Sequence, residues 1–200
     1  MNPRRHLIRT LATTSLLALT VLTGCTDSKP QFKAIDITGA DYAKDFSLTD
    51  QHGKLRSLAD FKGKVVVVFF GFVQCPEVCP TTMAELAAVK KQLGADGDKF
   101  QALFITVDPE RDTPEVLKAY MINFDPSFLA LYAPPERLAV LAKDFKVHYK
   151  KTAGTSPGSY SMDHSAGSYV YDPQGNLRLY TRYGSGVQAL VDDIRLLFKH

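Results

Sequence analysis

The chain has 200 residues, and its 24 Lys and Arg residues against 21 Asp and Glu residues give a formal net charge of +3. Three arginines and no acidic residue lie within the first 24 residues, so the remainder carries no net charge. This length predicts one domain with a single ample core, and the lack of a basic stripe with interleaved aromatic residues argues against nucleic-acid binding.

The N-terminus has the pattern of a secretory signal. A basic start is followed by an apolar stretch over residues 11–22, which is too short to span a bilayer, and then by Leu22-Thr23-Gly24-Cys25. This tetrapeptide resembles the bacterial lipobox, which implies removal of residues 1–24 and attachment of lipid to the thiol of Cys25. The alternative is an ordinary signal that leaves a free cysteine, which would be a liability in an oxidising compartment.

The mature chain is therefore expected to be a lipoprotein, anchored in a membrane and facing the periplasm or another extracytoplasmic space. Residues 25–40 are polar with little periodicity, and we expect them to form a tether between the lipid and the domain. The domain itself is expected over residues 41–200.

The domain is predicted to open on a β-hairpin, because residues 46–49 and 54–57 flank a turn that ends in Gly53. Residues 64–70 are almost all apolar, which predicts a strand buried on both faces. Apolar residues at helical spacing then predict a helix over about 82–93.

The later elements are expected in this order: a strand over 100–107, a helix with Thr113 as N-cap that ends near 123, a strand over 128–132, a helix from 134 to about 145, a loop over 150–163, a hairpin of 168–171 with 177–181, and a helix over 187–198. This order is typical of a thioredoxin-like α/β fold, with a central mixed sheet flanked by helices. The N-terminal β-hairpin would be an extension of that fold.

Cys75 and Cys79 lie at the turn between the strand over 64–70 and the following helix. Unpaired N–H groups at a helix start favour anions, so at least one of these thiols should be acidic and reactive. If the turn is helical, both sulfurs can converge on one ion or form a disulfide. An inert structural disulfide is a weaker alternative, because closing so small a loop removes little entropy from the unfolded chain.

Four segments of the chain carry a resemblance to a known family. The first is Gly71-Phe72 with Cys75-Pro76 and Val78-Cys79-Pro80-Thr81-Thr82, and the second is Val107-Asp108-Pro109-Glu110-Arg111-Asp112-Thr113-Pro114. The third is Asp163-His164-Ser165, and the fourth is Tyr169-Val170-Tyr171-Asp172-Pro173. Over most of residues 42–198 the chain resembles the Sco/SenC family. The resemblance implies a membrane-tethered, copper-binding protein that helps assemble the dinuclear copper centre of cytochrome c oxidase subunit II. It would act either by delivering copper or by reducing the cysteines of its target.

By the same resemblance, Cys75, Cys79 and His164 are the metal ligands. Two thiolates and one imidazole suit copper(I), with copper(II) as a second state, whereas structural zinc would normally require four protein ligands. The implied partners are subunit II or another cuproprotein, other periplasmic copper carriers or thiol reductases, and the membrane through the lipid anchor.

Several neighbouring residues allow more than one interpretation. His148, at the other end of the expected loop, is the alternative ligand to His164. Met162 could offer a thioether to the metal or pack in the core. Asp108 could orient a ligand through a hydrogen bond or cap the turn that follows it.

Two other function classes remain open. The chain could be an extracytoplasmic thiol–disulfide oxidoreductase that uses Cys75 and Cys79 as a redox pair, or a copper or redox sensor. The sequence leaves open whether the chain is an enzyme: the main expectation is a metallochaperone, with thiol–disulfide reductase activity as the enzymatic alternative. A peroxiredoxin-like peroxidase is disfavoured, because such enzymes place Thr three residues before the reactive cysteine, where this chain has Phe72.

Overall fold

The computed structural model describes residues 30–154 and 156–199. The expected signal over residues 1–24 and the expected lipid site at Cys25 lie outside the described residues. The elements in chain order are β1 (Ile35–Asp36), β2 (Leu48–Asp50), β3 (Leu55–Arg56), the 3₁₀ helix η1 (Leu58–Phe61), β4 (Val65–Gly71), α1 (Val78–Leu93), the 3₁₀ helix η2 (Gly94–Lys99), β5 (Phe100–Thr106), α2 (Pro114–Met121), β6 (Leu129–Tyr132), α3 (Pro135–Asp144), β7 (Tyr149–Ala153), β8 (Tyr160–His164), β9 (Ser168–Tyr171), β10 (Leu177–Thr181) and α4 (Val187–Leu197).

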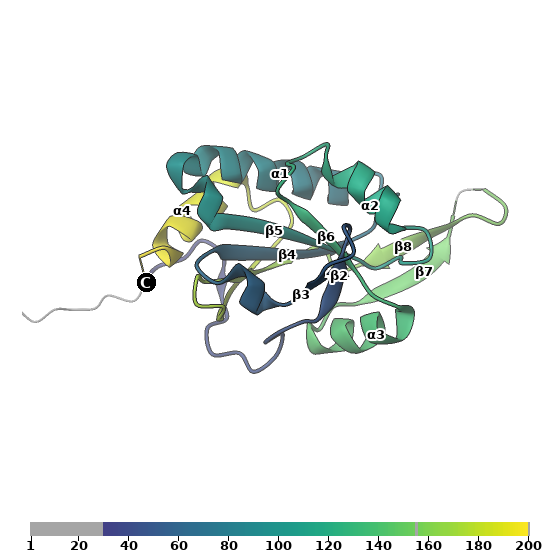
Figure 1. The fold of residues 1–200 in the computed structure, drawn as a ribbon, viewed down its shortest axis with the longest axis horizontal. Helices are drawn as coiled ribbons and strands as arrows, with labels where there is room; N and C mark the ends of the chain where they lie inside the picture. The colour runs from purple at the N-terminus through teal and green to yellow at the C-terminus, as the bar shows by residue number, and fades with distance from the viewer. Residues whose placement is uncertain (1–29, 155, 200) are drawn as a thin grey trace, which may run out of the picture.

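Eight strands form one mixed sheet in the order β1-β10-β9-β4-β5-β6-β2-β3. β4, β5 and β6 are parallel, and the outer strands pair antiparallel. Figure 1 shows α1 and α2 on one side of the sheet and α3 on the other, and α4 packs against α1. The predicted thioredoxin-like α/β class is thereby confirmed. In the described part of the chain, none of the helices combines the length and apolar character needed to cross a bilayer.

The centre of the sheet places two loops at one edge. Every residue of β4 is buried, as expected for a strand covered by helices on both faces. β4 and β5 run parallel in register from Val65 opposite Phe100 to Gly71 opposite Thr106. The loop that carries the first cysteine and the loop that follows β5 therefore start side by side.

Both edges of the sheet are formed by N-terminal residues. The predicted hairpin is present as β2 and β3, and β2 joins the sheet by pairing with β6. At the opposite edge, Ile35–Asp36 pairs with β10, and the Ile37 N–H donates to the Arg178 carbonyl at 2.8 Å. The structured domain therefore begins before residue 41, and Ile35–Asp36, within the expected tether, is a strand of the sheet.

The prediction of a loop over residues 150–163 is wrong. Tyr149–Ala153 and Tyr160–His164 form an antiparallel pair of strands, β7 and β8, separate from the central sheet. We call this pair the arm. The strands escaped prediction because most of their side chains are exposed or half-buried, so no alternation of apolar and polar residues marks them.

Candidate metal centre

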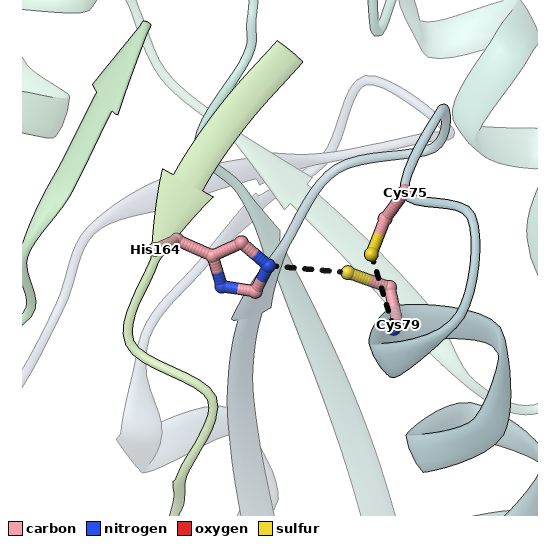
Figure 2. A group of neighbouring side chains, drawn as sticks. All are labelled: Cys75, Cys79 and His164. Atoms are coloured by element: carbon pink, nitrogen blue, oxygen red, sulfur yellow. Dashed lines mark hydrogen bonds between the residues drawn. The ribbon is translucent and has the colours of Figure 1, made fainter. Parts of the chain in front are cut away.

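Cys75, Cys79 and His164 meet at the edge of the sheet where β4 ends. Cys75 lies in the loop after β4, Cys79 is the second residue of α1, and His164 is the last residue of β8. One sulfur from each cysteine and one ring nitrogen of His164 all lie within 4.8 Å of one another. Figure 2 shows the imidazole pointing from the arm toward the two sulfurs. The structure thus brings together the three residues that the sequence singled out.

The helix that carries Cys79 starts earlier than predicted, at Val78 rather than near residue 82. Pro80 is compatible with this start, because the first N–H groups of a helix have no partner within it. Cys75 therefore lies outside the helix, and its sulfur accepts a hydrogen bond from the Cys79 N–H at 3.3 Å. The two sulfurs converge through this turn rather than along one helical face.

The two thiols are not equivalent. The Cys79 side chain is buried and that of Cys75 is half-buried. A hydrogen bond from the Cys79 thiol lowers the pKa of Cys75 to about 4, with further help from His164 and from backbone N–H groups. The same interaction, together with burial, raises the pKa of Cys79 far above its ordinary value. At neutral pH the metal-free pair therefore holds one thiolate, on Cys75, and one thiol.

The His164 ring is held in one orientation and one tautomer. Its Nδ1 lies 2.9 Å from the Ser165 carbonyl oxygen, which can only accept, so Nδ1 carries the proton. The other ring nitrogen, Nε2, lies 3.4 Å from the Cys79 sulfur. Phe69 and Phe72 contact the ring edge-on, with centroids 6.0 and 5.7 Å away. The nitrogen free to bind a metal is thus the one that faces the cysteines.

Gly71 leaves space for the buried sulfur. A Cβ at this position would lie 2.9 Å from the Cys79 sulfur and 2.8 Å from carbon atoms of Phe69 and Phe104. All three neighbours are buried, so none could move aside easily. Position 71 therefore requires glycine, because these three side chains approach its backbone too closely for a Cβ atom.

Asp112 supports the loop between β4 and the first cysteine, a role the sequence analysis did not assign. Its carboxylate accepts hydrogen bonds from the Val73 N–H at 3.0 Å and from the Thr106 hydroxyl at 2.6 Å. Burial raises the pKa of this carboxyl group. Asp112 belongs to the motif of residues 107–114, which could have marked it as important. Only the fold shows that this segment contacts the cysteine loop.

The alternative candidates lie outside the cluster. His148 is exposed, and its backbone N–H donates to the Ser165 hydroxyl at 3.0 Å. Met162 is buried in the hydrophobic core. The Asp108 carboxylate accepts hydrogen bonds from the side chains of Arg111 and Tyr160. Neither of these partners belongs to the cluster of Cys75, Cys79 and His164. Within the described residues, His164 is the histidine that accompanies the two cysteines.

The donor set favours a soft metal. Two sulfurs and one imidazole nitrogen suit copper(I), whereas a structural zinc site would normally add a fourth protein ligand. Cys75 and His164 are only half-buried, so an incoming ligand can reach the site. The same two cysteines are unpaired and close enough to exchange with a disulfide.

Comparisons of the sequence and of the structure with known proteins all identify the same family. A model of the SCO1/SenC family matches residues 36–199. The Bos taurus protein SCO2 homolog, mitochondrial, is 36% identical over 153 residues, which are 76% of this chain and 58% of that protein. The chain therefore spans less than two thirds of the length of this curated relative.

Two solved structures share the fold. Bradyrhizobium japonicum ScoI with copper bound is 39% identical, with a TM-score of 0.68, over 76% of this chain and 96% of that one. The apo Sco1 protein of Thermus thermophilus is 35% identical, with a TM-score of 0.74, over 85% of this chain and 99% of that one. One relative is thus known with copper and another without it.

Proposed function

This chain belongs to the SCO1/SenC family, and we propose that it binds copper through Cys75, Cys79 and His164. The observation that carries the proposal is the convergence of two sulfurs and one imidazole nitrogen within 4.8 Å. These soft ligands match copper(I), and the imidazole also suits copper(II). The similarity to Bradyrhizobium japonicum ScoI, whose structure contains copper, supports the same assignment.

The protein would act on the dinuclear copper centre of cytochrome c oxidase subunit II, or on another cuproprotein. With only three protein ligands, the site can accept a thiolate or imidazole from a partner, which displaces this chain's ligands step by step. Copper is then the cargo of the protein rather than a permanent cofactor. Periplasmic copper carriers would load the site, and thiol reductases would keep its cysteines reduced.

The proposed location follows from the N-terminal sequence. Cleavage before Cys25 and lipid on its thiol would anchor the chain in a membrane, with the domain in the periplasm or another extracytoplasmic space. The support is the lipobox-like Leu22-Thr23-Gly24-Cys25 after an apolar stretch. An unmodified Cys25 in the mass spectrum of the protein isolated from its cells would contradict the anchor.

A copper titration of the purified, reduced full-length protein tests the proposed site. We expect one copper(I) per chain, and loss of tight binding in Cys75→Ser and in Cys79→Ser, because each change removes a thiolate. His164→Ala should weaken binding and alter the copper(II) spectrum most, since copper(II) favours nitrogen. The matched control is His148→Ala, which should bind as the parent does. Unchanged stoichiometry and affinity in both cysteine variants would refute the site.

A second candidate function rests on the unequal thiols. A half-buried Cys75 with a pKa of about 4 beside a protonated Cys79 is an arrangement that also suits thiol–disulfide exchange. The protein would then reduce the cysteines of the copper centre while its own pair became a disulfide. Copper transfer to a reduced target, compared with reduction of an oxidised one, separates the two functions.

A further inference from the structure

The arm carries His164 without belonging to the central sheet. In the described part of the chain, β7 and β8 pair with each other and with no strand of that sheet. Figure 1 shows the arm extending away from the body of the domain. Sheet hydrogen bonds therefore do not hold β8 itself, which is placed by the short connection from His164 to β9 and by contacts between the arm and the body.

One face of β8 is turned toward the body. Tyr160, Met162 and His164 alternate along the strand and so share a face. Met162 is 7% exposed, whereas its neighbour Asp163 is exposed. At the base of the arm, the Ser165 N–H donates to the His148 carbonyl at 2.9 Å. The arm is thus tied at its base beside His164, and a second attachment lies at Tyr160.

Arg111 makes that second attachment. Its Nη1 donates to the Tyr160 carbonyl at 2.8 Å and to the Gln74 side-chain oxygen at 3.0 Å. Its guanidinium carbon lies 3.7 Å from the centroid of the Tyr160 ring. Because Gln74 immediately precedes Cys75, one guanidinium group contacts both the cysteine loop and the strand that ends in His164.

Asp108 completes the attachment. It forms an ion pair with Arg111 Nε and accepts a hydrogen bond from the Tyr160 hydroxyl at 2.9 Å. The side chains of Asp108 and Arg111, an ion pair within the body, are 1% and 20% exposed, whereas those of Glu110 and Lys151, an ion pair between body and arm, are 57% and 48% exposed. Ion pairs between exposed side chains contribute little to stability. We call the group of Arg111, Asp108, Tyr160 and Gln74 the clasp.

We propose that Arg111 is a positioning residue for the metal site, which sets the place of His164 relative to the two sulfurs through the clasp. The inference rests on the proposed function, in which these three residues hold copper. Metal–ligand distances tolerate only small deviations, so a slight shift of β8 relative to the cysteine loop would remove the imidazole from the metal while both thiolates remained. The hydrogen bonds of the Arg111 side chain go to Asp108, Gln74 and the Tyr160 carbonyl, and not to the proposed metal ligands.

The test is a double-mutant cycle on the full-length protein with Arg111→Lys and His164→Ala. Lysine keeps the positive charge but lacks the planar fork that reaches Tyr160 and Gln74 together. Arg111→Lys should weaken copper(I) binding about 10-fold or more, as loss of a ligand-orienting contact does. In the His164→Ala background the same change should alter affinity by no more than about twofold, because the residue through which it acts is gone.

Two further readouts distinguish positioning from general stability. Electron paramagnetic resonance of the copper(II) form should lose its imidazole nitrogen coupling in Arg111→Lys. In the metal-free protein, backbone amides of β8 should exchange faster, while those of β4 keep the rate of the parent. Lys150→Gln is the matched control, because it removes an exposed positive charge from the same arm and should change none of these quantities.

Tyr160→Phe gives a milder version of the experiment if Arg111→Lys does not fold. It removes the hydroxyl bond to Asp108 but keeps the ring over the guanidinium, so a smaller change in the same direction is expected. Parental affinity, nitrogen coupling and β8 exchange in Arg111→Lys would overturn the proposal. An equal loss of affinity with and without His164 would overturn it as well. If the parent bound no copper, the proposed function would fail, and the exchange of the metal-free protein would still decide whether the clasp holds the arm.

Discussion

At the scale of single residues, the site depends on two cysteines with different surroundings. Cys75 receives a hydrogen bond from the Cys79 backbone N–H and remains half-buried, while Cys79 lies against Gly71 in the core. A metal must remove the proton from Cys79, because copper binds thiolates. Copper binding should therefore release about one proton at neutral pH, since Cys75 is already ionised.

The inequality of the thiols can be measured by alkylation. We expect iodoacetamide to modify Cys75 much faster than Cys79 in the reduced, metal-free protein, with mass spectrometry of the peptides as the assay. Because the pKa of Cys75 is lowered from 9.0 to about 4, its rate should change little between pH 8 and pH 6. A thiol of ordinary pKa would lose about tenfold per pH unit over that range.

Cys79→Ala supplies the control for this measurement. It removes the thiol that donates to Cys75, so the pKa of Cys75 should rise and its alkylation at pH 6 should slow. A tenfold fall per pH unit already in the parent protein would contradict the ionised Cys75.

At the scale of elements, a buried carboxylate of α4 helps to attach the N-terminal segment to the fold. Asp193 of α4 is 1% exposed and accepts hydrogen bonds from the Lys33 and Ala34 N–H groups at 2.7 and 2.8 Å. These bonds place Ile35–Asp36 beside β10 as the edge strand β1. Because β1 has only two residues, we expect its pairing with β10 to depend on this attachment.

Asp193→Ala tests this attachment. The free energy of unfolding should fall by about 1.5–3 kcal/mol, the range for hydrogen bonds to a charged group, because two N–H donors lose their acceptor. Urea denaturation of the full-length protein measures it, and copper affinity should be unchanged. Asp192→Ala, one residue away on the less buried side of α4, is the control and should stay within about 0.5 kcal/mol of the parent. Equal stability of both variants would show that the segment is not held by Asp193.

The elements that could be predicted are those whose residues pack against the core. β4 was clear from its continuous apolar run, and α1 from its apolar spacing, although Pro80 obscured its first turn. The arm was missed because neither of its strands buries a regular face. The three candidate site residues followed from motifs, but the clasp around Arg111 did not, because its hydrogen bonds join residues up to 52 positions apart that only the fold brings together.

At the scale of the whole molecule, the topology builds the site from distant parts of the chain. Cys79 and His164 are 85 residues apart in sequence, yet their side chains lie 3.4 Å apart. β4 supplies a rigid base for the cysteine loop, the loop after β5 braces it through Asp112, and the arm brings the imidazole from outside the sheet. One half of the site is thus fixed in the core, and the other half is carried by a separate element. A metal can enter and leave such a site without disturbing the sheet.

This arrangement favours copper delivery over thiol reduction, because dithiol exchange needs His164 at most to help lower the pKa of Cys75, whereas a ring nitrogen close to both sulfurs completes a set of three metal ligands. The copper(I)-loaded protein should metallate an apo fragment of subunit II whose cysteines are already reduced, and His164→Ala should impair this transfer. The metal-free protein should leave the reduced fragment unchanged. For a reductase, Cys75 would attack the disulfide of an oxidised fragment, Cys79 would complete the exchange as the protein's own disulfide formed, and Cys79→Ser would trap the mixed disulfide. Efficient reduction of the oxidised fragment by metal-free protein, together with failed copper transfer to the reduced one, would reverse the preference.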